Sequence, residues 1–255
     1  MTRIIAVAAQ KGGVAKTTSA INLGAELATL GQRVLLVDMD PQGHLAEGFG
    51  IIADELESDI SLVLSDHSDT TLTDIIQAVG NHLELAPSNI YLADLELEMV
   101  SMVRREDRLK HALETVSGNY DYILIDCPPS LGILTVNAFS AADEVLVPMA
   151  CEFYALLGVA QLQKSVFQMQ RVLNPRLAIS GIIPTRKRHT KHATEVIERA
   201  KEEFPSLTIF EPAVPETVVV ANASAEGKPL VEFAPTAPAR LAYQKIAKEL
   251  CHHGK

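Results

Sequence analysis

A glycine-rich segment near the start of the chain carries the residue types that hold a polyphosphate. It occupies residues 10–18 and reads QKGGVAKTT. Glycines allow backbone N–H groups to approach phosphate oxygens closely, because no Cβ stands in the way. We expect Lys16 to reach the β- and γ-phosphates, the Thr17 hydroxyl to coordinate Mg²⁺, and Thr18 to lie near the α-phosphate. The segment therefore predicts an ATPase that uses MgATP.

This phosphate loop, residues 10–18, departs from the general pattern GxxxxGK[ST] at both of its glycines. Gln10 stands at the first position and Ala15 at the second. A glycine-rich turn into a helix without a ligand is the simpler interpretation, but two lysines and two threonines at these offsets have no packing role. The residues expected to cradle the nucleotide are Lys11, Gly12, Gly13, Val14, Ala15, Lys16, Thr17 and Thr18.

Acidic residues follow two apolar runs farther along the chain. Asp38 and Asp40 come after the run 34–37, and Asp126 comes after a similar run. We expect Asp40 to orient the attacking water, and Thr17, Asp38 and Asp126 to hold Mg²⁺, which keeps much of its hydration shell. An isolated Asp-x-Asp is more often a turn with a helix cap. The phosphate loop upstream favours the catalytic interpretation.

Short β-branched runs alternate with longer helical patterns, and several of these runs are apolar throughout. The expected strands are 3–8, 33–38, 82–86, 120–126, 144–148, 177–183 and 207–210, and the expected helices are 16–30, 104–117, 131–141, 156–173, 191–204 and 237–250. Apolar strands are typical of a parallel sheet that is buried on both faces. We therefore predict one α/β domain over residues 1–255, with a doubly wound, mostly parallel sheet flanked by helices. Ligands bind such sheets beyond the carboxyl ends of the strands.

The composition limits where the protein works and what it binds. The formal charge is −10, from 22 basic and 32 acidic side chains, so any contact with nucleic acid must be local. A basic segment, here defined as Arg186, Lys187, Arg188 and Lys191, offers such a contact. No apolar run approaches the roughly 18 residues of a membrane span, and the N-terminus does not look like a secretory signal. We expect a cytoplasmic protein without membrane contact.

The three cysteines form no Cys-x-x-Cys pair and no zinc-ligand spacing. They therefore indicate neither a disulfide framework nor a metal cluster, as is common in a reducing cytoplasm. Cys127 follows Asp126 directly and is interpreted as a small buried residue.

Together these motifs resemble the ParA family of partition ATPases, which belongs to the deviant Walker A group of P-loop NTPases. The likeness covers KGGVAKTT, DMDPQG, DCPPSLGILTVNA at 126–138, CEFYALLGVAQL at 151–162 and ANASAEGKPLVEFAP at 221–235. In that group an additional lysine, here Lys11, reaches the nucleotide of the partner subunit. The resemblance implies that Lys11, Lys16 and Asp40 are catalytic and that ATP drives formation of a homodimer.

Family membership further implies a slow ATPase that associates with the nucleoid. The ATP-bound dimer would bind DNA without sequence preference, and a ParB-like or cargo-adaptor protein would stimulate hydrolysis. Such a cycle segregates or positions a plasmid, a chromosome or a protein cargo. The basic segment lies at one of the two places where relatives carry DNA-binding cations, whereas the other place reads VVV at 218–220. Thr185 and Pro215 lie where relatives contact adenine, although Pro215 could instead be the first residue of a helix.

Two alternatives come from other branches of the same group. A membrane-associated regulator such as MinD needs an amphipathic anchor at the C-terminus, whereas residues 241–250 look like a docking helix. A redox protein such as the nitrogenase iron protein needs cluster-binding cysteines, and neither Cys127 nor Cys151 lies in that ligand context.

Overall fold

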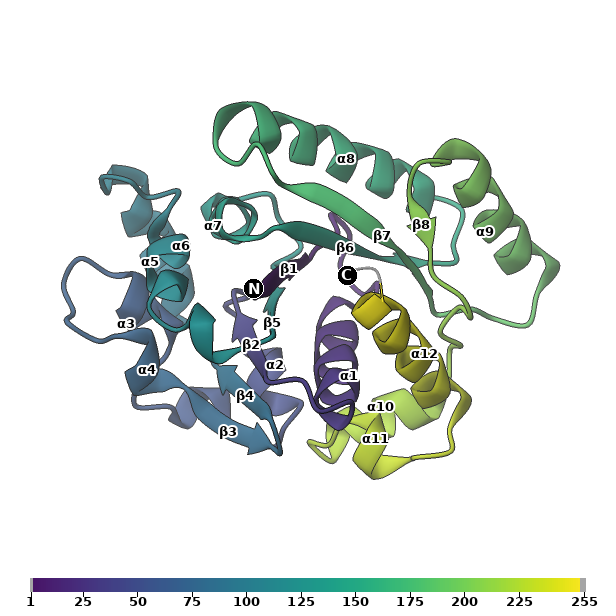
Figure 1. Ribbon diagram of the computed structural model, residues 1–255, viewed down its shortest axis with the longest axis horizontal. Coiled ribbons are helices and arrows are strands. Elements are labelled where there is room, and N and C mark those ends of the chain that lie inside the picture. Colours follow the sequence, from purple (N-terminus) through teal and green to yellow (C-terminus); the bar gives the residue numbers. More distant parts are fainter. Residues whose placement is uncertain (1, 253–255) are drawn as a thin grey trace.

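The computed structural model describes residues 2–252 and contains a single eight-stranded sheet (Figure 1). Its strands are ordered β3-β4-β2-β5-β1-β6-β7-β8. Only β3 runs antiparallel to its neighbour. The bounds are β1 (Arg3–Val7), β2 (Val34–Asp38), β3 (Gln77–Gly80), β4 (Leu83–Ala86), β5 (Tyr122–Asp126), β6 (Glu144–Ala150), β7 (Ala178–Thr185) and β8 (Thr208–Ile209). The predicted doubly wound, mostly parallel sheet is confirmed.

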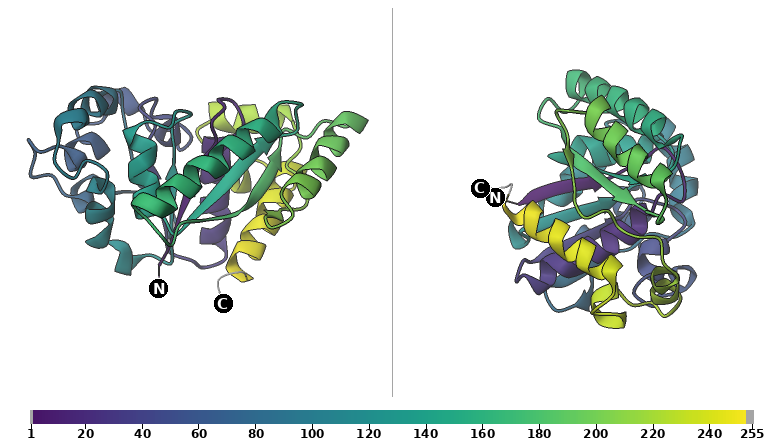
Figure 2. Two further views of the ribbon diagram at one scale, coloured as in Figure 1. Left: turned by 90° about the horizontal axis from the view of Figure 1, so that it is seen from above. Right: turned by 90° about the vertical axis from the view of Figure 1, so that its right-hand side faces the viewer.

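Helices cover both faces of the sheet (Figure 2). One face carries α1 (Lys16–Thr29), α2 (His44–Glu47), α10 (Val218–Ala225), α11 (Leu230–Phe233) and α12 (Pro238–His252). The other face carries α3 (Ile60–Leu64), α4 (Leu72–Ile75), α5 (Tyr91–Glu98), α6 (Arg108–Glu114), α7 (Ile133–Ala141), α8 (Ala155–Val172) and α9 (Lys191–Glu203). Short 3-10 turns occupy Ala53–Glu55, Met99–Ser101 and Ser117–Asn119.

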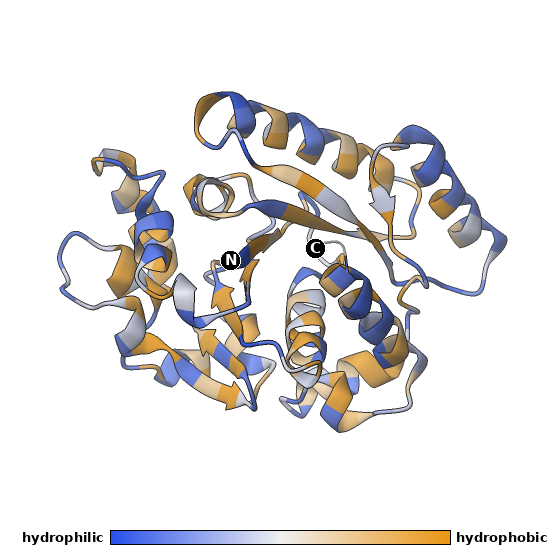
Figure 3. Cartoon of the chain, viewed as in Figure 1, coloured by the Kyte–Doolittle hydropathy of each residue, from blue (hydrophilic) through white to orange (hydrophobic). Residues whose placement is uncertain are grey.

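The central strands β1, β2 and β5 are largely apolar because each of them contributes side chains to two hydrophobic cores. In β2, Leu35 and Val37 pack against the α7 and α8 side, whereas Val34 and Leu36 pack against α1 and α12. Figure 3 shows β2 mainly in orange, while the outer helices alternate in colour. Successive side chains of a strand point to opposite faces, so a central strand needs apolar residues at every position.

Helix α12 packs along α1, the helix that follows the phosphate loop. Its buried side chains include Tyr243, Ile246 and Leu250, which belong to the same core as α1. Arg240 forms an ion pair with the buried Glu26 of α1, with a distance of 2.7 Å from Nε to Oε1. Within residues 2–252, no helix combines the length and apolar character needed to cross a membrane.

The structure corrects several predicted elements. Strand β3 was missed because its exposed edge sequence, QAVG, has no apolar run. The helix predicted over 104–117 begins only at Arg108, since Arg104 adopts a left-handed φ of 55° that breaks a helix. Helix α10 begins at Val218 with Thr217 as its N-cap, so the alternative that placed Pro215 at the start of a helix is wrong. The short helices α2, α3, α4, α5 and α11 were also not predicted.

Candidate functional site

The predicted site residues meet at the carboxyl edge of the three central strands. Asp38 at the end of β2 pairs in register with Asp126 at the end of β5, and Asp126 pairs with Val7 at the end of β1. Backbone hydrogen bonds continue past the strand ends, from Met39 N to the Asp126 carbonyl at 2.9 Å. The order of the strands therefore brings together motifs that lie more than a hundred residues apart in the sequence.

The phosphate loop connects β1 to α1 through two left-handed residues. Gly13 has a φ of 72°, and Ala15 has a φ of 67° and a ψ of 39°. The left-handed region is open to glycine but costs an L-residue about 1–2 kcal/mol. Ala15 therefore keeps the backbone shape of the glycine that usually stands at this position, at an energetic cost. Helix α1 then begins at Lys16.

Two consecutive residues at the end of β7 donate hydrogen bonds to backbone carbonyls of the phosphate loop. The Thr185 hydroxyl donates to the Val14 carbonyl at 2.9 Å, and the Arg186 guanidinium donates through Nη1 to the Gly13 carbonyl at 3.0 Å. Thr185 is fully buried. The sequence assigned Thr185 only to the adenine, so its role in anchoring the loop is a finding of the structure.

Two buried carboxylates lie beside the phosphate loop. Both oxygens of Asp38 accept backbone N–H groups, from Asp40 at 3.0 Å and from Leu45 at 3.2 Å. Burial, and then the charge of Asp126, raise the pKa of Asp38. Burial also raises the pKa of Asp126 to about 7, opposed by the Thr17 hydroxyl and the Lys16 ammonium.

The buried oxygens around Asp126 fit a bound cation. Asp126 is 1% exposed, and its Oδ1 has no hydrogen-bond partner within residues 2–252. An orphaned buried carboxylate oxygen is rare in a folded protein unless something else satisfies it. Oxygen ligands and a neighbouring threonine hydroxyl are the donor set that Mg²⁺ prefers. The predicted metal residues Thr17, Asp38 and Asp126 therefore lie in one place with suitable chemistry.

The remaining catalytic candidates differ in their exposure. Lys16 is buried, with 7% of its surface exposed, and its charge acts on Asp126. The Asp40 carboxylate is partly exposed and accepts the Gln42 N–H at 3.1 Å. Lys11, by contrast, has 51% of its side chain exposed, and its Nζ lies 2.7 Å from Oε2 of Glu152 in the loop after β6.

A cavity of about 660 Å³ opens beside the phosphate loop. Its lining residues are Gly13, Ala15, Thr18, Thr185, Arg186, Val214, Pro215, Glu216, Thr217, Val218, Val220, Ala221, Ser224 and Tyr243. The lining combines phosphate-loop residues and hydroxyl side chains with apolar residues such as Val214, Val218 and Val220. Thr185 and Pro215 both line it, in agreement with the idea that they lie near the base of a nucleotide. Its size suits a small-molecule site.

The basic segment divides into paired and unpaired cations. Arg186 Nη2 lies 2.8 Å from Oε1 of Glu216, and Arg188 contacts the other oxygen of the same carboxylate. Hydrogen bonds from Arg188, which has the larger effect, and from Arg186 lower the pKa of the Glu216 carboxyl to about 2. Within the described residues, Lys187 and Lys191 form no ion pair. The four predicted DNA-binding residues therefore do not present equivalent free charges.

Sequence reasoning missed the acids that organise this edge. Glu152 bridges Lys11 and Arg186, and Glu216 bridges Arg186 and Arg188. Glu216 follows Pro215 directly, and Glu152 lies inside the CEFYALLG segment, but neither position has a spacing that points to the phosphate loop. The interpretation of Cys127 was correct, because this cysteine is fully buried and its burial raises the pKa of the thiol.

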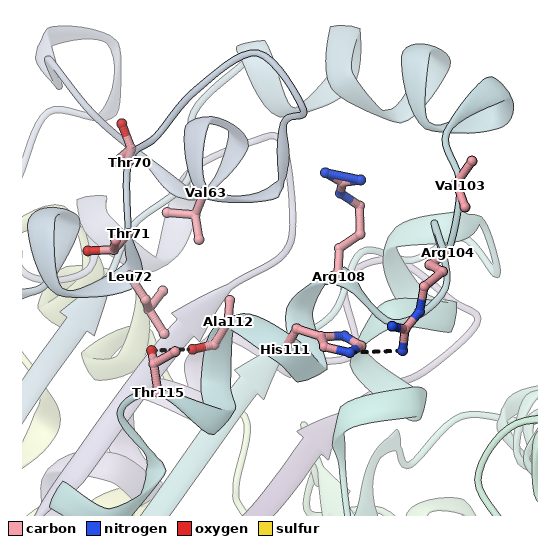
Figure 4. Close-up of a pocket in the computed structure, with 10 residues that line it drawn as sticks. All are labelled: Val63, Thr70, Thr71, Leu72, Val103, Arg104, Arg108, His111, Ala112 and Thr115. Atoms are coloured by element: carbon pink, nitrogen blue, oxygen red, sulfur yellow. Dashed lines mark hydrogen bonds between the residues drawn. The ribbon is translucent and has the colours of Figure 1, made fainter.

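A second cavity, of about 420 Å³, lies between α3, α4 and α6 and shares no lining residue with the first (Figure 4). Arg104 Nη2 and His111 Nε2 are 2.9 Å apart on one side of it, and the Thr115 hydroxyl donates to the Ala112 carbonyl at 2.7 Å. Arg108 is bound to the Leu64 carbonyl and to Asp66. The polar groups of this cavity are therefore largely engaged with their own chain.

Comparisons with known proteins agree with this geometry. Residues 2–179 match the family model described as an AAA domain. The sporulation initiation inhibitor protein Soj of Bacillus subtilis is 44% identical over 256 residues, covering all of both chains. The chromosome partitioning protein ParA of Caulobacter vibrioides is 38% identical, covering 97% of this chain and 93% of that protein.

A solved structure extends the comparison to a bound nucleotide. The cobyrinic acid a,c-diamide synthase of Mycobacterium smegmatis, crystallised with an ATP analogue and magnesium, superposes with a TM-score of 0.87 and 36% identity. The match covers 99% of this chain and 96% of that one. The phosphate loop, the buried carboxylates and these likenesses agree, and the chain belongs to the AAA-domain family of P-loop ATPases that includes Soj and the ParA partitioning proteins.

Proposed function

We propose that this chain is a partition ATPase that dimerises around MgATP, binds DNA without sequence preference, and segregates or positions a cargo with the help of a stimulating partner protein. One observation carries this proposal. The phosphate loop presents two lysines in opposite settings, with Lys16 buried beside Asp126 and Lys11 exposed at the rim. A buried lysine serves a nucleotide in its own subunit, whereas an exposed one is accessible to a second subunit.

The side chains around the phosphate loop can each be given a role in hydrolysis. Lys16 and the loop N–H groups would neutralise and hold the phosphates of ATP, while Thr17, Asp38 and Asp126 would hold Mg²⁺. The bound cation would supply charge neutralisation at the γ-phosphate. Asp40, whose carboxylate is partly exposed, would orient the attacking water. Catalysis of this kind depends on positioning and electrostatics more than on proton transfer. Slow turnover is expected from the family resemblance.

Dimerisation would require Lys11 to exchange partners. In the single chain its ammonium is neutralised by Glu152 at 2.7 Å. An ion pair between half-exposed groups contributes only about 0–1 kcal/mol, so a phosphate group can displace the carboxylate at little cost. Lys11 would then contact the nucleotide of the second subunit.

DNA contact would rest on the outward cations of the basic segment. Lys187 and Lys191 are free of ion pairs within residues 2–252, and Arg188 is exposed although it contacts Glu216. A dimer would present each of these cations twice, and each phosphate that is neutralised adds to the salt dependence of binding. Contact of this kind would associate the protein with the nucleoid.

The membrane-associated alternative has less support from the structure. Helix α12 buries most of its apolar residues in the core that it shares with α1, and Leu241 is its exposed large apolar side chain, so little apolar surface is available to insert into a bilayer. Co-sedimentation with anionic vesicles in the presence of ATP would detect membrane binding directly, and clear pelleting would favour that alternative.

Light scattering after gel filtration measures whether the protein is a dimer, and retention on a DNA column measures whether the basic segment binds DNA. We expect Asp40→Ala with MgATP to be a dimer and to stay on DNA at 100 mM salt, and the same protein with ADP to be a monomer that elutes. Lys11→Ala with MgATP should remain a monomer while still binding nucleotide. A monomeric Asp40→Ala protein with saturating MgATP would contradict the proposed cycle.

A further inference from the structure

Arg186 differs from the rest of the basic segment in where its side chain lies. Among the described residues that line the 660 Å³ cavity, it is the only lysine or arginine. Its guanidinium reaches the phosphate loop, with Nη1 at 3.0 Å from the Gly13 carbonyl oxygen. Arg188, two residues farther on, forms no hydrogen bond or ion pair with residues 10–18. Both arginines contact the Glu216 carboxylate, but only Arg186 also reaches the phosphate loop.

The backbone at Arg186 is strained, and three partner residues hold its side chain. Its φ of 50° lies in the left-handed region, which an arginine adopts at a cost of about 1–2 kcal/mol. Arg186 Nη2 lies 2.8 Å from Glu216, Nη1 lies 3.8 Å from Glu152, and Nη1 also donates to Gly13. Strain of this kind persists where the surroundings fix the conformation, and it is concentrated at functional sites.

These contacts control which way the peptide groups of the phosphate loop face. Peptide units are planar and trans, so the carbonyl and the N–H of one unit point in opposite directions. Arg186 holds the Gly13 carbonyl, and the Thr185 hydroxyl holds the Val14 carbonyl at 2.9 Å. The N–H groups of Val14 and Ala15 are thereby turned to the other side of the loop. Two neighbouring side chains thus orient two successive N–H donors.

We propose that Arg186 is a positioning residue of the nucleotide site, and that it does not belong to the DNA surface. It pins the Gly13 peptide so that the next N–H is set for a phosphate oxygen, and Glu216 fixes the guanidinium that does so. This inference rests on nucleotide binding by the phosphate loop and does not depend on DNA binding. It also separates Arg186 from Lys187, Arg188 and Lys191, which remain the candidates for DNA contact.

Arg188 provides a matched control, because it contacts the same Glu216 carboxylate without reaching the phosphate loop. Isothermal titration with magnesium and a non-hydrolysable ATP analogue should show affinity weakened about tenfold or more in Arg186→Gln, as expected for loss of a hydrogen bond from a charged donor. Arg188→Gln should bind within twofold of wild type. Arg186→Lys, which keeps the charge but not the planar fork, should fall between them.

Kinetics and DNA retention complete the test. Arg186→Gln should raise the KM for ATP more than it lowers kcat, because the side chain acts on binding, whereas a merely misfolded fraction would lower kcat alone. At saturating nucleotide Arg186→Gln should still stay on DNA. If it instead binds nucleotide as wild type does but loses DNA, the inference is wrong. If neither wild type nor any variant binds DNA, the proposed partition function is wrong, but the proposed role of Arg186 in nucleotide binding is unaffected.

Should Arg186→Gln fail to fold, two milder variants test the same claim. Glu216→Gln keeps Arg186 but removes its charged partner, and we expect it to weaken nucleotide affinity about threefold. Arg186→Lys should weaken affinity by a factor that is smaller than for glutamine but measurable. Wild-type affinity in both variants, with an unchanged melting temperature, would overturn the inference.

Discussion

Replacing Ala15 with glycine should stabilise the protein without changing any side-chain contact of the site. Ala15 adopts a φ of 67° and a ψ of 39°, where an L-residue is strained by about 1–2 kcal/mol. Glycine removes that strain but gains conformational freedom in the unfolded chain, which offsets about 0.4–1 kcal/mol. The free energy of unfolding of Ala15→Gly should therefore rise by roughly 0.5–1 kcal/mol. Urea denaturation of the nucleotide-free protein measures this change.

Two glycines of the same loop provide controls for the Ala15 variant. Gly13 has a φ of 72°, so a Cβ at this position introduces the strain that Ala15→Gly removes. Gly13→Ala should therefore lower the free energy of unfolding by about 1 kcal/mol. A Cβ on Gly12 would meet nothing within 4 Å, and its φ is not positive, so Gly12→Ala should be nearly neutral. A lower free energy of unfolding in Ala15→Gly, or equal effects in Gly12→Ala and Gly13→Ala, would refute the reasoning from backbone strain.

Three further substitutions test other parts of the structure. Arg240→Ala leaves the buried Glu26 without its ion-pair partner and should lower the free energy of unfolding by about 3 kcal/mol. Burial raises the pKa of Glu26, so the folded state binds the proton more tightly than the unfolded state does, and the loss should be smaller at pH 5 than at pH 8. Thr185→Val removes the hydroxyl that donates to the Val14 carbonyl and should cost about 1–2 kcal/mol by urea denaturation, with weaker nucleotide binding. Asp40→Ala should bind MgATP like wild type but hydrolyse it at least tenfold more slowly in a phosphate-release assay, and ordinary turnover would remove Asp40 from the mechanism.

The sequence predicted the central part of the fold because the signal there is strong. Buried parallel strands need apolar residues at every position, and β2 and β5 show this directly. The peripheral elements were not predicted, because their sequences carry only a weak signal. Strand β3 lies at an edge with alternating exposure, and α10 opens with Val218, whose β-branched side chain favours a strand in isolation.

The candidate site was predictable where residues lie close together along the chain or at the ends of neighbouring parallel strands. The phosphate loop, with the metal candidate Thr17, follows from nine consecutive residues, and the metal candidates Asp38 and Asp126 follow from strand ends that a parallel sheet brings together. The ion pairs of Glu152 and Glu216 join segments far apart in the sequence, and only tertiary contacts reveal them. From the sequence alone, Arg186 is one cation of a basic run, whereas in the structure its guanidinium donates a hydrogen bond to the Gly13 carbonyl of the phosphate loop.

The proposed function requires that the phosphate loop binds a nucleotide and that the buried Lys16 neutralises its phosphates. Isothermal titration of the purified protein with magnesium and a non-hydrolysable ATP analogue tests this most directly. We expect saturable one-to-one binding by wild type, weakening at least a hundredfold in Lys16→Ala, and no comparable loss in Lys11→Ala under conditions where the protein is monomeric. Absence of binding by folded wild-type protein, or equal affinity in Lys16→Ala, would contradict the account.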